Sequence, residues 1–418
     1  MSDRKSSPKL SSPSTQLKLV DAAPMRICFL SHSSHNGGAE RVLLETIEVL
    51  QMQGAECRVL LPSRGELCQE LGRLGVPFSI VSFPLWMSRG KARFALRCRA
   101  AFGILVNTLM IAWSIHRWGC DIVYSNTATV CVGGLASRLV GRPHIWHLHE
   151  FGLEDQALSF LFGDNASLAL INRLSSRCIC VSHALASKYA QSIDPSKIVV
   201  IYPSMHLALK DGTDSTQFES CVTSRKRFRC VIVGTLMEGK GQGESVLAFA
   251  RLREIGIDAE LLVVGDGLPD YCHFLGGLVR SNQLEDRVTF VGQVRDALTP
   301  MRSSDAVLVC SKSEAFGRVT IEGMFVGKPV IGARSGATAE LIQDGVNGLL
   351  YNQGDPSDLA AKIEYLYKNP GIANELGRNG QSWVEKCFTQ ERYAGELIAV
   401  LKSLSLPIAK VIGPAPAV

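Results

Sequence analysis

The sequence predicts an α/β protein made of two doubly wound domains, each with a largely parallel sheet. At 418 residues the chain is too long for one ordinary core. From residue 25 onward short apolar runs alternate with longer helix-like stretches, and a polar, turn-rich stretch at 207–227 divides this alternation in two. With 46% hydrophobic and 20% charged residues, the chain has enough apolar material for two cores.

Residues 25–206 are the predicted first domain. Several of its candidate strands are apolar on both faces, as in a buried parallel sheet. A helix is expected at 39–54, with Gly54 at its C-terminal end. The candidate strands are RICFL (26–30), CRVLL (57–61), FSIVS (78–82), DIVYSN (121–126), HIWHLHE (144–150), RCICVS (177–182) and IVVIYP (198–203).

Residues 228–385 repeat the pattern and form the predicted second domain, with 207–227 as the linker. Two such domains side by side make a cleft at the carboxyl ends of their strands, where ligands of open α/β sheets bind. The candidate strands of this domain are FRCVIVGTL (228–236), AELLVVGDG (259–267), RVTFVGQV (287–294), AVLVCS (306–311), KPVIGAR (328–334) and NGLLYN (347–352).

Composition narrows the classes of partner. The net charge of +5 is mild and does not indicate nucleic acid. Thirteen cysteines, mostly within apolar runs, are expected to be buried free thiols. Residues 1–24 are rich in Ser, Pro and Lys, which predicts a disordered tail rather than a signal peptide and hence a cytoplasmic protein; 406–418 is a second tail.

A basic and apolar stretch at 86–113 has two interpretations. It is either an amphipathic helix packed under the first sheet or, through 86–99, a peripheral binding site for an anionic membrane surface. The apolar run 100–115 is shorter than the ~20 residues that a spanning helix needs, so no transmembrane segment is predicted. The basic residues are Arg89, Lys91, Arg93, Arg97 and Arg99.

Glycines follow the first strand of each predicted domain. Gly37 and Gly38 would let backbone amides approach an anion at a helix N-terminus, although a tight turn without a ligand explains them equally well. Gly234 and Lys240 occupy the corresponding place in the second domain. The lysine is either a phosphate-binding charge or an ordinary surface lysine. Gly265 belongs to an incomplete dinucleotide-like loop at 264–267.

The stretch SEAFGRVTIEG (313–323) carries Glu314 and Glu322 with seven residues between them. If a helix begins near Gly317, the amides around Phe316, Gly317 and Arg318 point into the cleft. One acid can then face the sugar of a ligand and the other its ribose, with phosphate between them. The alternative is a solvated helix with two incidental glutamates. The acids are too far apart to act as a glycosidase pair.

From about residue 26 to 405 the chain resembles the retaining GT-B glycosyltransferases of glycosyltransferase family 4. The resemblance is carried by motifs in the family's order. These are GGAE (37–40), DIVYSNT (121–127), HLHE (147–150), G-x-L-x-x-x-K-G (234–241), VGDG (264–267) and SEAFGRVTIEGMFVGKPVIGARSGATAELI (313–342), which contains the family's E-x7-E block.

This resemblance implies a GT-B fold, with two Rossmann-like domains facing across a cleft and a C-terminal helix (386–405) crossing back to the first domain. It also implies transfer of a sugar from a nucleotide-diphosphate sugar to a glycan, lipid-linked or small-molecule acceptor. Glu314 would contact the sugar and Glu322 the ribose of the donor. Phe316, Gly317 and Lys240 would hold the diphosphate.

The remaining implied residues lie on the acceptor side. Gly37 and Gly38 would line the cleft opposite the diphosphate, and His149 would lie by the reacting centre with Asn126 nearby. The chain departs from the family at Thr235, where an arginine is usual. Neutralisation of the diphosphate charge would then depend on Lys240, or on another base such as Lys312 or Arg318.

No D-x-D tripeptide occurs, and the HIWHLHE histidines do not have the arrangement of a metal site, so a metal-free site without a cofactor other than the co-substrate is expected. Two rival functions remain open on the sequence. One is a GT-B nucleotide-sugar isomerase or epimerase, and the other is a catalytically weak nucleotide-sugar-binding homologue.

Overall fold

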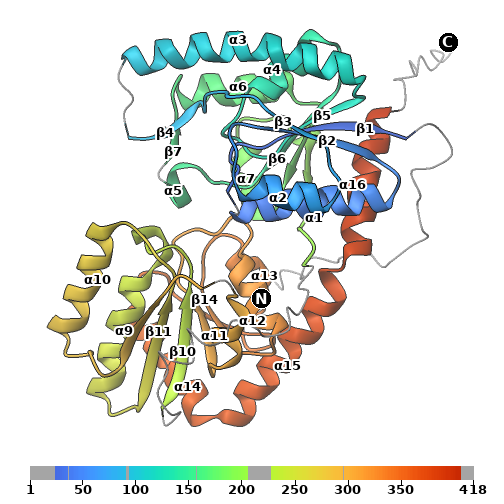
Figure 1. Cartoon of the computed structure of the whole chain (residues 1–418). Coiled ribbons are helices and arrows are strands. Elements are labelled where there is room, and N and C mark those ends of the chain that lie inside the picture. Colours follow the sequence, from blue (N-terminus) through green and yellow to red (C-terminus); the bar gives the residue numbers. More distant parts are fainter. Residues whose placement is uncertain are drawn as a thin grey trace, which may run out of the picture.

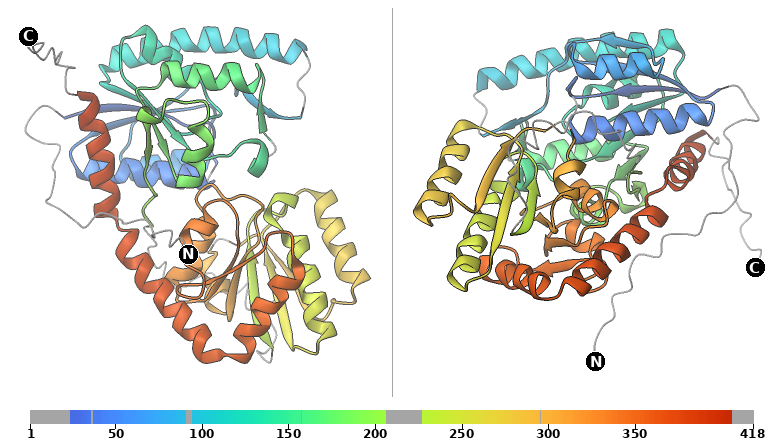
Figure 2. Two further views of the ribbon diagram at one scale, coloured as in Figure 1. Left: turned by 180° about the vertical axis from the view of Figure 1, so that it is seen from behind. Right: turned by 60° about the horizontal axis from the view of Figure 1, so that its bottom comes forward.

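The computed structural model describes residues 24–35, 37–90, 94–156, 158–205, 227–294 and 296–405. It consists of two α/β domains that face each other across a cleft (Figures 1 and 2). The predicted tails and linker lie outside the described residues, apart from Pro24 and Arg227. The predicted fold class is confirmed.

The N-terminal domain is built on a seven-stranded parallel sheet with strand order β3-β2-β1-β5-β6-β8-β9. Because strands buried on both faces read as continuous apolar sequence, each strand lies within one of the predicted apolar runs, except that β2 begins one residue earlier, at Glu56. The strands are β1 (Arg26–Leu30), β2 (Glu56–Leu61), β3 (Phe78–Ile80), β5 (Ile122–Ser125), β6 (His144–Leu148), β8 (Arg177–Cys180) and β9 (Ile198–Val200).

Helices cover both faces of this sheet (Figure 1). The helix that follows β1 ends just before Gly54, whose φ of 86° is the left-handed conformation that glycine favours at a helix end. The helices are α1 (Gly38–Met52), α2 (Glu66–Arg73), α3 (Phe94–Trp118), α4 (Val132–Leu139), α5 (Leu153–Gln156), α6 (Asp164–Leu174), α7 (His183–Tyr189) and the 3₁₀ turn η1 (Pro195–Lys197).

A small antiparallel ribbon lies beside the main sheet and was not predicted. It pairs β4 (Met87–Arg89) with β7 (Leu158–Phe160). Each strand has three residues, too few to show a periodic pattern. The side chain of Trp86 anchors the ribbon, because its ring stacks against Trp146 and its Nε1 donates to the carbonyl of Ala128 over 2.6 Å.

The C-terminal domain has a six-stranded parallel sheet with order β12-β11-β10-β13-β14-β15. Its strands are β10 (Phe228–Val233), β11 (Ala259–Val264), β12 (Val288–Gly292), β13 (Ala306–Val309), β14 (Val330–Ala333) and β15 (Leu349–Tyr351). Its helices are η2 (Glu238–Lys240), α9 (Gln242–Glu254), α10 (Pro269–Ser281), α11 (Leu298–Arg302), α12 (Arg318–Phe325), α13 (Thr338–Leu341), α14 (Pro356–Lys368) and α15 (Pro370–Cys387).

The last helix, α16 (Gln390–Ser405), crosses back to the N-terminal domain (Figure 1). Its apolar side joins the core around α1, and the hydroxyl of Tyr393 lies 2.7 Å from that of Thr46. The chain therefore passes between the domains twice. At the crossing the amide of Met205 donates to the carbonyl of Phe388 over 3.0 Å, and Arg392 donates to the carbonyl of Tyr202 over 2.6 Å.

Candidate functional site

A cleft of about 730 Å³ separates the two domains. It lies at the carboxyl ends of both sheets, where the sequence predicts the ligand site. Every predicted site residue except Asn126 lines it, and Asn126 bonds to one that does. The lining residues among those predicted are Gly37, Gly38, His149, Gly234, Thr235, Lys240, Gly265, Glu314, Phe316, Gly317, Arg318 and Glu322.

An ion pair between Lys240 and Glu314 lies on the C-terminal wall of the cleft. Nζ of Lys240 lies 2.6 Å from Oε1 of Glu314, and the hydroxyl of Ser311 donates to the same oxygen over 2.6 Å. Gly241 allows the turn that places the lysine, because it has a φ of 73° and a Cβ there would lie 2.1 Å from the carbonyl oxygen of Cys310. Both charged residues were predicted to contact a donor, and the structure brings them together.

The N-terminus of α12 opens toward the same region. Gly317 precedes the helix in the left-handed conformation, with a φ of 80° and no side chain capping the helix. Within the described part of the chain, no hydrogen bond uses the amides of Arg318 or Val319. These amides and the helix dipole make a positive region suited to an anion. The ring of Phe316 is buried in an aromatic cluster with Tyr202 and Phe388 beside the cleft.

The glycine-rich strand ends of β10 and β11 approach each other closely. A Cβ on Gly265 would lie 2.0 Å from the carbonyl oxygen of Gly234, and the two glycines have φ values of 134° and 148°. Both positions therefore require glycine. Thr235 follows at this edge with its side chain exposed on the cleft. It contributes a hydroxyl there and no charge.

The guanidinium of Arg318 is occupied by two carboxylates. Its Nη1 lies 3.1 Å from Oε1 of Glu45 on α1, and its Nε lies 3.1 Å from Oε1 of Glu322. Burial raises the pKa of Glu45 to about 7 and also raises the pKa of Glu322, while the arginine works in the opposite direction on both. Arg318 thus joins the two domains and orients Glu322, so its side chain is not free to neutralise a phosphate. Lys312 pairs with Glu238 at the surface. Of the three bases considered for the phosphate, Lys240 is therefore the one left to face it in the cleft.

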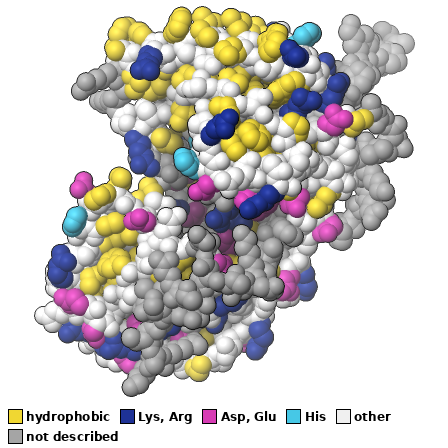
Figure 3. All heavy atoms as spheres, in the orientation of Figure 1, with side chains coloured by type: hydrophobic (Ala, Val, Ile, Leu, Met, Phe, Trp, Pro, Cys, Tyr) yellow, Lys and Arg dark blue, Asp and Glu magenta, His cyan; other side chains and the backbone are white. Residues whose placement is uncertain are grey.

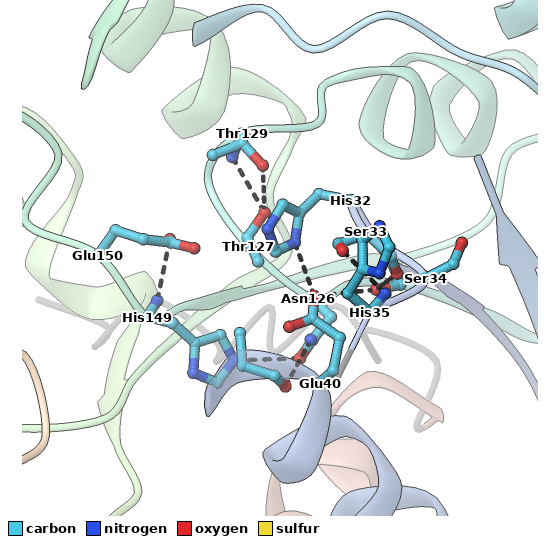
Figure 4. Close-up of polar contacts among 12 residues, drawn as sticks. His32, Ser33, Ser34, His35, Glu40, Asn126, Thr127, Thr129, His149 and Glu150 are labelled. Atoms are coloured by element: carbon cyan, nitrogen blue, oxygen red, sulfur yellow. Dashed lines mark hydrogen bonds and ion pairs between the residues drawn. The ribbon is translucent and has the colours of Figure 1, made fainter. Parts of the chain in front are cut away.

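His149 forms a short polar chain on the opposite wall (Figure 4). Its Nε2 lies 3.0 Å from Oδ1 of Asn126, whose Nδ2 donates to the carbonyl of Ala39 over 2.9 Å. Since Oδ1 can only accept, Nε2 carries the hydrogen and Nδ1 keeps a lone pair. Burial, with smaller contributions from His147 and His32, holds the pKa of His149 well below its usual range. The ring is therefore neutral near pH 7.

Three carboxylates from the N-terminal domain also line the cleft, and none of them was among the predicted site residues. Burial raises the pKa of Glu40 to about 7 and that of Glu150 to about 8, and it also raises the pKa of Asp155. Gly37 makes room for Glu40, because a Cβ on Gly37 would lie 2.6 Å from Oε2 of that glutamate. Glu40 and Glu150 are the last residues of the GGAE and HLHE motifs, so the motifs could have identified both as site residues. Asp155 lies in no motif.

Glu340 forms a second contact between the domains. This residue of α13 accepts hydrogen bonds from the amides of His183 and Ala184 at the start of α7, and from the hydroxyl of Tyr202 over 2.5 Å. An acid at a helix N-terminus is favourable because the unpaired amides there are positive. Its position in the GATAE stretch could have identified Glu340 from the sequence.

The histidines of β6 have hydrogen-bond partners inside the domain. His144 and His147 are buried, where Ser125 and Tyr124 are their respective hydrogen-bond partners. Across the described ranges, no three His, Cys, Asp or Glu side chains are grouped as metal ligands would be.

Two family models match the chain. Residues 36–209 match the model described as Glycosyltransferase Family 4, and residues 215–383 match the one described as Glycosyl transferases group 1. These ranges correspond to the two domains.

Individual proteins agree with these matches. The N-acetyl-alpha-D-glucosaminyl L-malate synthase of Bacillus anthracis is 31% identical over 218 residues, which are 52% of this chain and 56% of that protein. A D-inositol 3-phosphate glycosyltransferase of Actinosynnema mirum is 30% identical over 297 residues, 68% of this chain and 67% of that one. The match therefore spans little more than half of the Bacillus protein.

A solved structure extends the similarity to almost the whole chain. HepE of Anabaena, crystallised with UDP, superimposes with a TM-score of 0.75 at 26% identity, covering 91% of this chain and 100% of that one. Further crystals of HepE contain UDP and glucose, or UDP-glucose. Taken with the two family models and the cleft between two Rossmann-like domains, these matches show that the chain belongs to the GT-B glycosyltransferases of family 4.

Proposed function

We propose that the protein transfers a sugar from a nucleotide-diphosphate sugar to an acceptor hydroxyl, with retention of configuration and without a metal ion. The observation that carries this proposal is the arrangement of the C-terminal wall. There the Lys240 and Glu314 pair lies in one cleft with the open N-terminus of α12. HepE, similar over its whole length, binds UDP-glucose, which makes UDP-sugars the first donors to test.

The donor would lie along this wall. The diphosphate would bind Lys240 and the amides at the start of α12, where the positive potential is concentrated. Glu314 would accept hydrogen bonds from sugar hydroxyls. Glu322, held by Arg318, would accept them from the ribose.

Departure of the nucleotide leaves negative charge on a diphosphate oxygen. Lys240 and the α12 amides would stabilise that charge as it develops, which is where electrostatic catalysis has its largest effect. The bond from the anomeric carbon to the diphosphate oxygen breaks, and the bond to the acceptor oxygen forms on the same face. The acceptor proton passes to the departing phosphate oxygen.

The acceptor would approach from the N-terminal wall. Neutral His149 can accept a hydrogen bond there through Nδ1, because its Nε2 already donates to Asn126, and Glu40 and Asp155 offer further polar groups. We propose a glycan, lipid-linked or small-molecule acceptor, with the reaction in the cytoplasm at the inner face of the membrane.

The test is to incubate the full chain with a panel of UDP-, GDP- and ADP-sugars, with and without membrane lipid extract, and to follow nucleotide release. The proposal expects release that depends on both donor and acceptor, with loss in the Glu314→Gln and Lys240→Ala variants. Conversion of the donor without any acceptor would instead identify an isomerase. Donor binding without turnover under every condition would identify a binding protein.

A further inference from the structure

Helix α3 presents a long apolar face to solvent. Eight of its large hydrophobic side chains are between 40% and 80% exposed, and they extend along the helix from its first residue to its fifth turn. Figure 3 shows hydrophobic atoms gathered along the edge of the N-terminal domain where α3 lies. Soluble proteins rarely expose a continuous apolar patch of this kind without a function. The side chains are Phe94, Leu96, Phe102, Leu105, Val106, Leu109, Met110 and Trp113.

The opposite face of α3 is part of the domain. Its buried side chains include Ile104, Ile111 and Ile115, which belong to the core, and the helix packs against α4. By length and composition alone α3 is also a candidate membrane span. If α3 crossed a bilayer, its buried face would have to separate from the core. The geometry therefore favours a helix that lies on the membrane surface.

The charge around this face is of one sign. None of the 25 residues of α3 is Asp or Glu, whereas Arg97 and Arg99 near its start and Arg117 near its end are exposed. Arg89, on the preceding strand, is also exposed, and the guanidinium of Arg117 lies 5.2 Å from the ring centre of Trp113. An apolar face bordered by arginines, with an aromatic residue beside one of them, is complementary to an anionic lipid surface.

The ribbon of β4 and β7 connects this face with the cleft. β4 precedes α3 in the chain, and Figure 1 shows the ribbon between the start of α3 and the cleft. Leu85, Met87 and Leu158 from this region line the cleft and make part of its wall apolar. An amphiphile could therefore keep its tail in lipid beside α3 while its polar end reaches His149.

We propose that α3 docks the N-terminal domain on an anionic bilayer and that the acceptor is an amphiphile taken from that bilayer. The statement about the acceptor rests on the proposed transferase function, whereas the docking does not. The two can therefore fail separately.

Flotation of the purified full chain with phosphatidylcholine vesicles containing 0 to 40% phosphatidylglycerol tests the docking. The proposal expects binding that increases with the anionic fraction and weakens with added salt. The double variant Leu105→Glu with Leu109→Glu should lose at least tenfold in partition coefficient, and Arg97→Gln with Arg99→Gln should lose severalfold on anionic vesicles. Since these side chains are exposed, the variants should keep the parental melting temperature.

Matched controls come from the far domain. Leu268→Glu and Arg280→Gln also change exposed residues and should bind vesicles as the parent does. Failure of the parent to float with anionic vesicles at low salt would overturn the docking, as would equal binding by the α3 variants. A parent that dimerises through α3 in light scattering and binds no vesicles would assign the face to a second copy of the chain.

The acceptor is tested separately by comparing turnover of a lipid-linked glycan in vesicles with that of the same glycan released from its lipid. The proposal expects at least tenfold faster transfer to the lipid form, with the difference abolished in the Leu105→Glu, Leu109→Glu variant. Equal rates on both forms would overturn the amphiphilic acceptor. Absence of any donor binding in a thermal-shift assay would count against the transferase itself and leave the docking result standing.

Discussion

The ammonium group of Lys240 and the carboxylate of Glu314, 74 residues apart in the sequence, lie 2.6 Å apart in the cleft. The pair holds each side chain in place before a ligand arrives. An arriving diphosphate would compete with Glu314 for the lysine, while the sugar would offer the glutamate new hydroxyl partners.

We expect Lys240→Ala and Glu314→Gln each to lower the rate of nucleotide release by roughly 100-fold, because each removes a group placed to act on the transition state. Steady-state kinetics with saturating donor measure the effect. The pair of Lys312 and Glu238 is the matched control, since its atoms are also 2.6 Å apart but both side chains are at the surface. Lys312→Ala and Glu238→Gln should leave the rate unchanged. Full activity in both cleft variants would remove the basis of the proposed mechanism.

Thr235→Arg should tighten donor binding by about tenfold, because a guanidinium at this exposed edge of the cleft can form a charge-assisted contact with phosphate. Isothermal titration with the preferred nucleotide sugar measures the dissociation constant. Thr235→Val keeps the shape of the side chain and adds no charge, so it should not tighten binding. Weaker binding by the arginine variant would show that the diphosphate does not bind beside residue 235.

Arg318→Met should lower the apparent free energy of unfolding by about 3 kcal/mol at pH 8, because it leaves buried carboxylates without their cation. The loss should be smaller at pH 6, where Glu45 and Glu322 can take up protons. Their folded-state pKa values would exceed those of the unfolded chain, so stability decreases as pH rises. Urea unfolding at both pH values measures this. Arg334→Met breaks the exposed pair with Asp344 and should cost less than about 1 kcal/mol.

Stability of the parent should decline between pH 6.5 and 8. Burial raises the pKa of Glu40 to about 7 and that of Glu150 to about 8, so these groups hold protons in the folded state that the unfolded chain has already released. Glu150 can contribute up to about 1.4 kcal/mol of decline per pH unit in this range, whereas the contribution of Glu40 fades above about pH 7, where the folded state also releases that proton. Histidines with lowered pKa values, such as His32 at about 4, oppose this trend only below pH 6.5. Thermal melting should show a flatter profile for Glu150→Gln, and an unchanged slope would contradict the assignment.

Much of the fold was predictable because it depends on local pattern. Buried parallel strands read as apolar runs, and each strand of the two main sheets coincides with a predicted run to within one residue at its ends or lies inside it. The ribbon of β4 and β7 was missed, since its formation depends on packing around Trp86 rather than on periodicity. The exposure of α3 was likewise out of reach, because apolar sequence does not show which face a domain leaves uncovered.

The site was predictable where a motif placed a residue at a strand end. Lys240 and Glu314 are examples, and both face the cleft. Pairings across long separations were not predictable: Arg318 meets Glu45, which is 273 residues away in sequence. That contact changes the expected role of the arginine side chain, and only the relative placement of the two domains could reveal it.

The last described residues of the N-terminal domain before the linker meet the start of the segment that returns to that domain, where the amide of Met205 donates to the carbonyl of Phe388. A joint of this form acts as a hinge between the domains. Rotation about this joint can open the cleft, whereas sliding one domain past the other would break the bond from Met205 to Phe388. Opening of the cleft must also release Glu340 from the start of α7 and Arg318 from Glu45, so these two contacts stabilise the closed arrangement of the domains.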